Sequence, residues 1–64
     1  MEKVKISFNS GVYSIRLLCV YGENGRFTHL KAVKITPECQ ITVESTDSET
    51  VLEAFGKWSK ELSL

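Results

Sequence analysis

The residues of this chain that could carry chemistry are few, and their spacing matches no common type of catalytic site. His29 is the only histidine, and Cys19 and Cys39 are the only cysteines. Nucleophilic catalysis needs a hydroxyl or thiol beside a base that a third group orients. Cys19 lies in an apolar run, where cysteine behaves as a small hydrophobe, and Cys39 has no basic neighbour to activate its thiol. We therefore expect a structural role for His29 and no catalytic pair with Cys39.

The acidic residues and glycines give no stronger evidence of a metal site or a phosphate-binding loop. Glu44, Asp47 and Glu49 lack the spacing of a calcium loop, and no Cys/His set has the spacing of a zinc site. The segment Gly22–Gly25 lies between two predicted strands, whereas phosphate-binding glycine loops lead from a strand into a helix. We therefore expect no enzyme activity, no metal and no cofactor.

Length and composition indicate one globular domain covering residues 1–64. Hydrophobic residues make up 42% of the chain and charged residues 25%, which argues against disorder. A core of this size rarely supplies more than about 3–5 kcal/mol, so small domains often gain stability from disulfides, metals or self-association. Since two cysteines and no metal-ligand spacing are present, self-association is the favoured route.

Four segments read as strands because apolar and polar residues alternate within them. They are residues 3–8, 12–21, 27–35 and 40–45, and turn residues separate them at 9–11, 22–26 and 36–39. In the first segment the alternation places Val4, Ile6 and Phe8 inward. In the third segment the alternation is imperfect, and a bulge near Leu30–Lys31 would reconcile its two halves.

The last segment predicts an amphipathic helix. Thr46 and Glu49 have the spacing of a capping box. A stripe of apolar residues at helical spacing follows: Val51, Leu52, Phe55, Trp58 and Leu62. Gly56 and Ser59 border or enter this stripe, and we interpret them as small residues that let the helix lie close to the sheet. The predicted fold is α+β, a four-stranded antiparallel meander with one C-terminal helix on one face, ββββα.

The second strand suggests a binding surface. From Leu17 to Tyr21 it is apolar on both faces, and one helix covers only one face of a sheet. The second cover must be a partner or a bend that tucks the strand end under a loop, and we favour a partner. The predicted interface is Leu18, Val20 and Tyr21, and the simplest partner is a second copy. Such an interface should be insensitive to salt and lost in Leu18→Glu.

Charge suggests an alternative. Residues 1–36 carry six basic side chains against two acidic ones, and residues 37–64 carry the reverse, so the chain predicts a basic sheet and an acidic helix. On the sheet, the candidate anion-binding residues are Lys3, Lys5, Arg16 and Lys34. They would capture a nucleotide or nucleic acid, for example between the subunits of a nucleotide-sequestering oligomer. The net charge of zero and the lack of stacking aromatics argue against this alternative.

Localisation follows from what the chain lacks. No run approaches the roughly 20 apolar residues of a membrane helix, and residues 1–6 alternate instead of forming the apolar block of a signal peptide. We expect a cytoplasmic protein with reduced cysteines and no membrane partner. The leading hypothesis is a small non-enzymatic binding protein that acts stoichiometrically as a homo-oligomer. Its size is typical of inhibitors and accessory factors of phages and mobile elements, an analogy that no motif carries.

Overall fold

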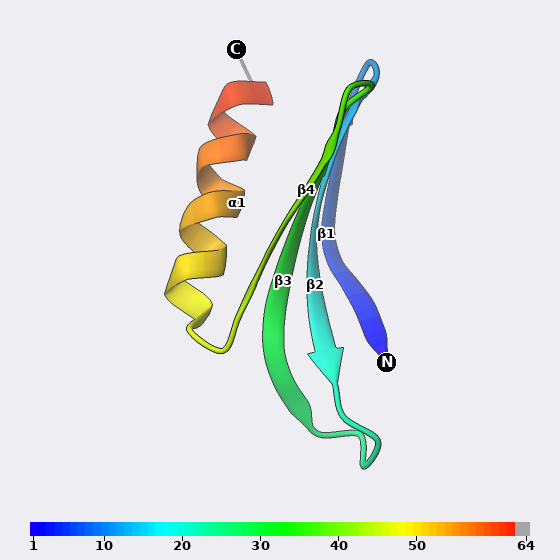
Figure 1. The fold of residues 1–64 in the computed structure, drawn as a ribbon, viewed down its shortest axis with the longest axis vertical. Coiled ribbons are helices and arrows are strands. Elements are labelled where there is room, and N and C mark those ends of the chain that lie inside the picture. Colours follow the sequence, from blue (N-terminus) through cyan, green and yellow to red (C-terminus); the bar gives the residue numbers. More distant parts are fainter. Residues whose placement is uncertain (63–64) are drawn as a thin grey trace.

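The computed structural model describes residues 1–62 and has the predicted ββββα fold (Figure 1). Its elements are β1 (Glu2–Ser10), β2 (Tyr13–Tyr21), β3 (Phe27–Ile35), β4 (Gln40–Ser45) and α1 (Ser48–Leu62). The strands form one antiparallel sheet in the order β1-β2-β3-β4. The predicted fold class is therefore confirmed.

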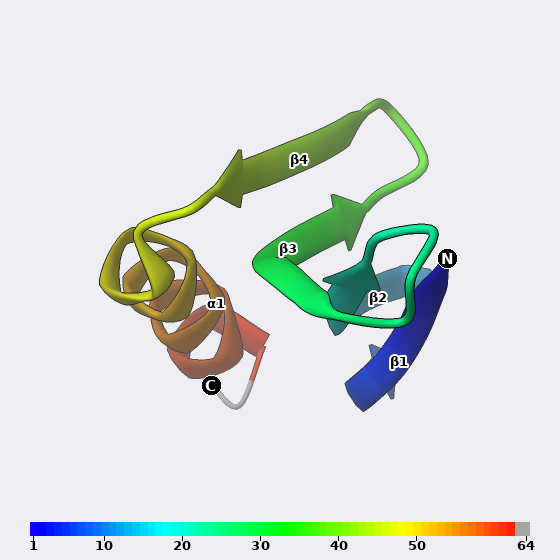
Figure 2. The same ribbon diagram turned by 90° about the horizontal axis from the view of Figure 1, so that it is seen from below.

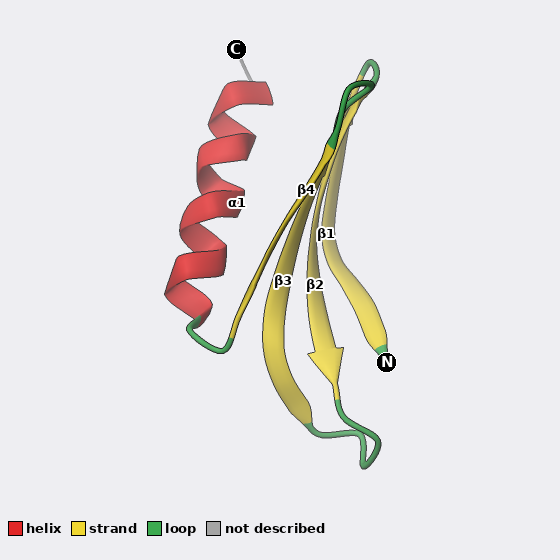
Figure 3. Cartoon of the chain, viewed as in Figure 1, coloured by secondary structure: helices red, strands yellow, loops and turns green. Residues whose placement is uncertain are grey.

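Turn chemistry explains how the strands connect (Figure 3). Gly11 has a φ of 61° in a two-residue turn between β1 and β2, where positive φ at the first central residue favours glycine. The five-residue loop 22–26 is held by a 2.8 Å bond from the Gly22 amide to the Arg26 carbonyl. Gly25, at a φ of 78°, makes its reversal, and the Asn24 side chain accepts from the Arg26 amide. The predicted loop between the second and third strands is thus confirmed.

The start of α1 corrects the predicted cap. The helix begins at Ser48, so the capping residue is Asp47 and not Thr46. One carboxylate oxygen of Asp47 accepts the Glu49 amide at 3.1 Å, and the other accepts the Thr50 hydroxyl at 3.1 Å. Asp47 satisfies a backbone donor that the first helical turn leaves unpaired, and its charge suits the helix N-terminus.

A single apolar core lies between α1 and the sheet. Its buried members are Ile15, Leu17, Leu30, Ala32, Val51, Phe55 and Trp58, and partly buried Cys19, Val43, Ala54 and Leu62 pack against it. The helix contributes its predicted apolar stripe except Leu52, which is exposed.

Gly56 does not have the role that the sequence suggested. A Cβ built on Gly56 would meet nothing within 4 Å, so no close approach to the sheet requires glycine there. Ser59 lies at the edge of the core, where its hydroxyl donates a 2.9 Å bond to the Phe55 carbonyl one turn earlier.

The register of β1 overturns the predicted alternation in that strand. Val4 pairs with Leu18 and Ile6 pairs with Leu17, with a register shift between them at Lys5. Because neighbouring residues of β2 point to opposite faces, Val4 and Ile6 also point to opposite faces. Val4 therefore lies on the face away from α1, and Ile6 lies on the face that carries α1.

The irregularity in β3 is also displaced from its predicted place. From Leu30 to Ile35 the pairing with β2 is regular, so Leu30–Lys31 holds no bulge. The shift occurs at Thr28, because Val20 pairs with His29 and Tyr21 pairs with Phe27. Because of this shift, Phe27 lies on the same face as Tyr21. Their ring centroids are 6.1 Å apart in an edge-to-face arrangement.

The helix does not cover the whole sheet. It packs against β2, β3 and β4, and Figure 2 shows it on the side of the sheet away from β1. Every residue of β1 is exposed. The helix therefore covers one face of the sheet except at the β1 edge.

Burial predicts unequal effects of two leucine truncations. Leu17 in β2 is 2% exposed and Leu52 in α1 is 47% exposed. Leu17→Ala should reduce the free energy of unfolding by about 2–5 kcal/mol, because it opens a cavity in the core. Leu52→Ala should change it by about 0.5 kcal/mol or less. Urea unfolding followed by Trp58 fluorescence measures both, and equal effects would contradict the core assignment.

Candidate functional site

On the sheet face away from α1, neighbouring side chains of the same chain cover the apolar residue at the centre. Leu18 is only 9% exposed in the single chain, and it pairs with Val4 on one side and Lys31 on the other. The ammonium of Lys31 in β3 lies 2.9 Å from the carboxylate of Glu2 in β1, so this ion pair spans β2. Long charged side chains cover apolar surface with their stems. Burial of Leu18 therefore needs neither a partner nor a bend.

The three predicted interface residues do not share one surface. Leu18 and Val20 lie on the face away from α1, and Tyr21 lies on the opposite face. Val20 and Tyr21 are partly buried, and the Lys3 ammonium sits 5.7 Å from the Tyr21 ring centroid. Since Leu18 is packed within the sheet, Leu18→Glu would disturb the fold as well as any interface.

The four predicted anion-binding residues are also divided. Lys34 points to the α1 side, 5.7 Å from the Trp58 ring centroid and 3.4 Å from the Glu61 carboxylate. Lys3 shares that side of the sheet, beside Tyr21, and Lys5 occupies the register shift in β1. Arg16 alone lies on the face away from α1, opposite Val33. No single basic sheet face is formed by these four side chains.

His29 lies in an arrangement whose order is hydroxyl, imidazole, carboxylate. The Thr28 hydroxyl lies 2.9 Å from Nδ1 of His29, and Nε2 lies 2.5 Å from the Glu44 carboxylate. The same hydroxyl donates to the Val20 carbonyl at 3.0 Å. A hydroxyl has one proton, so Nδ1–H is the donor to Thr28. In this arrangement His29 cannot accept the proton of Thr28, and the group serves to pair β3 with β4.

Two charges of this face have shifted pKa values. The hydrogen bond with His29 lowers the pKa of the Glu44 carboxyl, and the charges of His29 and Lys31 act in the same direction. The hydrogen bond with Glu2 raises the pKa of Lys31. Both shifts favour the charged forms of Glu44 and Lys31. The contacts of Lys31 with Glu2 and of His29 with Glu44 link β1, β3 and β4 on this face.

Metal binding and thiol chemistry have little support in the described residues. Among residues 1–62, no three His, Cys, Asp or Glu side chains gather closely enough to hold a metal ion. Cys19 is partly buried, Cys39 is exposed, and both thiols are free. The Thr36 hydroxyl accepts the Cys39 amide at 3.1 Å, which fixes the turn between β3 and β4.

The most distinctive surface lies where α1 stops short of β1. Ile6 is 37% exposed and Phe8 is 48% exposed, although both point to the face that carries the core. Phe8 stacks on Phe55 of α1 with ring centroids 6.1 Å apart. We call Ile6, Phe8 and the adjoining cleft the β1 side.

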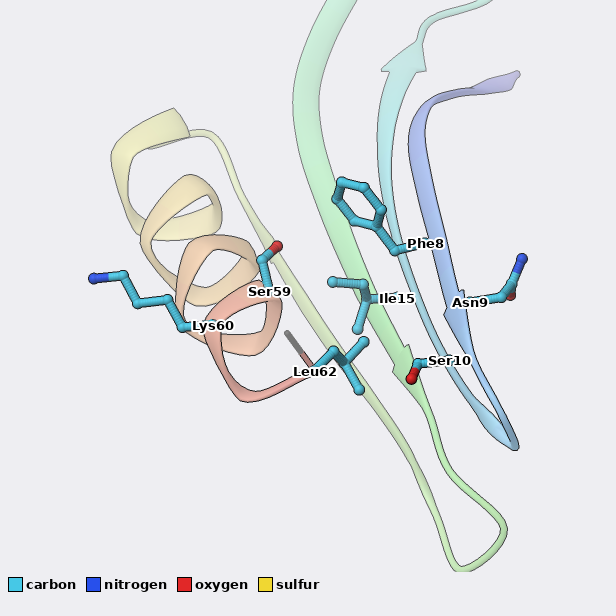
Figure 4. A pocket seen from close by; sticks show the side chains of 7 residues that line it. All are labelled: Phe8, Asn9, Ser10, Ile15, Ser59, Lys60 and Leu62. Carbon is cyan, nitrogen blue, oxygen red and sulfur yellow. The ribbon is translucent and has the colours of Figure 1, made fainter. Parts of the chain in front are cut away.

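The cleft of the β1 side has a volume of about 450 Å³. Its lining residues are Phe8, Asn9, Ser10, Ile15, Ser59, Lys60 and Leu62. Figure 4 shows Phe8, Ile15 and Leu62 pointing into the space between helix and strands, whereas Asn9 and Lys60 point away. The interior of the cleft is thus mainly apolar.

Sequence reasoning missed this surface. Ile6 and Phe8 were read as core residues because they alternate with polar residues, and their types are correct for a core. A signal was present in Lys5, because lysines and bulges are common on edge strands. Which strand α1 leaves uncovered is not encoded in any local pattern.

Comparison of the chain with protein-family models, curated proteins and solved structures finds no match. Within residues 1–62, no helix has the length and apolar character needed to cross a membrane. The function must therefore be inferred from the geometry of the chain itself.

The Glu44–His29 pair predicts a specific pH dependence. A carboxyl whose pKa is lower in the folded state stabilises the fold above its unfolded pKa, and this contribution is lost as the pH falls through the folded pKa. Stability should therefore decline as the pH falls below about 4.5, and Glu44→Gln should lack this part of the decline. Urea unfolding from pH 7 to pH 3 measures it. Glu38→Gln, in the exposed turn, is the control that should keep the decline; an unchanged profile in Glu44→Gln would contradict the assignment.

Proposed function

We propose that this protein is a small non-enzymatic binding protein that acts stoichiometrically and assembles as a homo-oligomer through its β1 side. The observation that carries the proposal is the exposure of β1 along its whole length, with Ile6 and Phe8 on the core-bearing face. Apolar and aromatic side chains of this kind form the centres of protein interfaces. An unpaired edge strand adds backbone donors and acceptors that a further strand can satisfy.

The dimensions of the chain support the same proposal. Its accessible surface is 4533 Å², whereas a compact monomer of 7.2 kDa has about 4100 Å². Its radius of gyration is 12.0 Å, whereas a compact chain of this length has about 10.7 Å. The excess surface of about 400 Å² is half of what a standard interface removes from each partner. Both values support a chain whose packing is completed by a partner.

The interface of this proposal differs from the one that the sequence suggested. The assembly still depends on apolar contact, but its residues are Ile6 and Phe8 in place of Leu18, Val20 and Tyr21. The first two are exposed, whereas Leu18 is already packed in the single chain. Assembly at the β1 side therefore requires no rearrangement of the charged face.

Solution mass at low and high salt tests this proposal. Light scattering coupled to size exclusion should give at least twice the 7.2 kDa of one chain at both salt concentrations, since apolar contact is not screened by ions. Phe8→Glu should give the mass of a single chain with an unchanged circular dichroism spectrum. A wild-type monomer at both salt concentrations would overturn the proposal.

The matched control for Phe8→Glu is Ile41→Glu. Ile41 lies in β4 at the other edge of the sheet, on the same face and with similar exposure. This variant should keep the mass of the wild type. Dissociation of Ile41→Glu with an intact Phe8→Glu oligomer would move the interface to β4 and overturn the assignment to the β1 side.

A further inference from the structure

The two halves of β1 differ in their ability to pair with another strand. The first half holds Lys3 and Lys5, and Lys5 sits at the register shift. Charged lysines and bulges are the features by which natural edge strands avoid pairing. The second half, residues 6–10, pairs regularly with β2 and carries no charge. The lysines and the register shift therefore end before Ile6 and Phe8, the exposed apolar residues of β1 on the α1 face.

We propose that the partner of the β1 side is a second copy of this chain, whose β1 pairs antiparallel with β1 across a two-fold axis at Ser7. The proposal rests on the function proposed above and specifies its geometry. A two-fold antiparallel pair is self-complementary, so the same residues serve both copies. The axis is normal to the sheet, which becomes a continuous eight-stranded sheet with both α1 helices on one face.

Side-chain chemistry selects the register. With Ser7 on the axis, Ile6 of each copy lies opposite Phe8 of the other, and the four side chains form one cluster on the α1 side. Cross-strand pairs of an aromatic and a β-branched residue stabilise a sheet. Ile6 of the second copy then covers part of the Phe8 side chain, which is 48% exposed in the single chain.

The same register keeps like charges apart. Lys5 of each copy lies opposite Asn9 of the other, and the register shift at Lys5 ends the regular pairing there. A register with Phe8 on the axis would instead place Ile6 opposite the polar Ser10. Ser7, which is exposed and points away from α1, marks the axis and is accessible to a chemical probe.

The β4 edge is less suited to this role. It is six residues long, whereas β1 has nine, and α1 packs against it directly. Val43 is accordingly half-buried against the core. On the α1 face, pairing at β4 would bury one exposed apolar side chain, Ile41, whereas pairing at β1 buries both Ile6 and Phe8, so the second copy is assigned to β1.

Disulfide crosslinking at Ser7 tests the register. The background is Cys39→Ser, which removes the exposed thiol, and Cys19 stays on the opposite face from Ser7. Directly opposed residues of an antiparallel pair have Cα atoms about 4.5–5.5 Å apart, which a disulfide can span. Oxidation of Ser7→Cys by diamide should convert the protein to a covalent dimer on a non-reducing gel, and the background protein should stay uncrosslinked.

The matched control is Asn9→Cys in the same background. Asn9 lies on the same strand and face as Ser7, two residues farther along. In the proposed register the two Asn9 positions are offset by four residues, about 14 Å, which is too far for a disulfide. Asn9→Cys should therefore remain uncrosslinked while Ser7→Cys reacts.

The outcomes separate the two proposals. A wild-type dimer by light scattering in which Ser7→Cys does not crosslink, or in which Asn9→Cys crosslinks instead, overturns the register and leaves the assembly intact. A wild-type monomer overturns both. Crosslinking of Ser7→Cys that Phe8→Glu abolishes, in a folded protein, supports pairing through Ile6 and Phe8.

Discussion

One helix is narrower than the sheet it must cover, and the rest of this structure depends on that constraint. An α-helix with its side chains is about 10–12 Å wide, whereas four strands spaced about 4.8 Å apart place the outer strand axes about 14 Å apart. A chain of 64 residues has one helix to place. Because β4 leads directly into α1, the helix lies toward β3 and β4, and β1 is the strand left uncovered.

The same constraint leaves the far face of the sheet without a helix, and charged side chains take its place. Glu2 and Lys31 join β1 to β3, and His29 and Glu44 join β3 to β4. Lys31 lies beside Leu18, and its ion pair with Glu2 spans β2, which accounts for the low exposure of Leu18 on an open sheet face. Of the six basic side chains in residues 1–36, Lys31 and Lys34 form ion pairs, and the pair of Lys34 with Glu61 joins the sheet to the helix.

Local patterns were sufficient to predict the elements and the fold class. Gly11, the Asn24–Gly25 turn and the apolar stripe of the helix each depend on neighbours within a few residues. The faces of β1 could not be predicted, because the register shift at Lys5 breaks an alternation that is unbroken in sequence. The prediction of the candidate site failed for a related reason. Phe8 belongs to the core or to the surface according to the position of a helix that begins forty residues later. No local sequence pattern specifies that position.

The unpaired backbone of the β1 edge and the exposed side chains of Ile6 and Phe8 need two different kinds of contact, and a second copy of the chain would supply both. A small apolar ligand in the cleft would cover Phe8 but would leave the backbone of residues 6–10 unpaired. A foreign strand would pair the backbone, but it would have to bring its own apolar residues to the cleft. A second β1 brings both, because Ile6 and Phe8 occupy the same face of the same strand. In the proposed pair, the two uncovered β1 strands would lie side by side between the two helices, and the two clefts would flank this pair of strands.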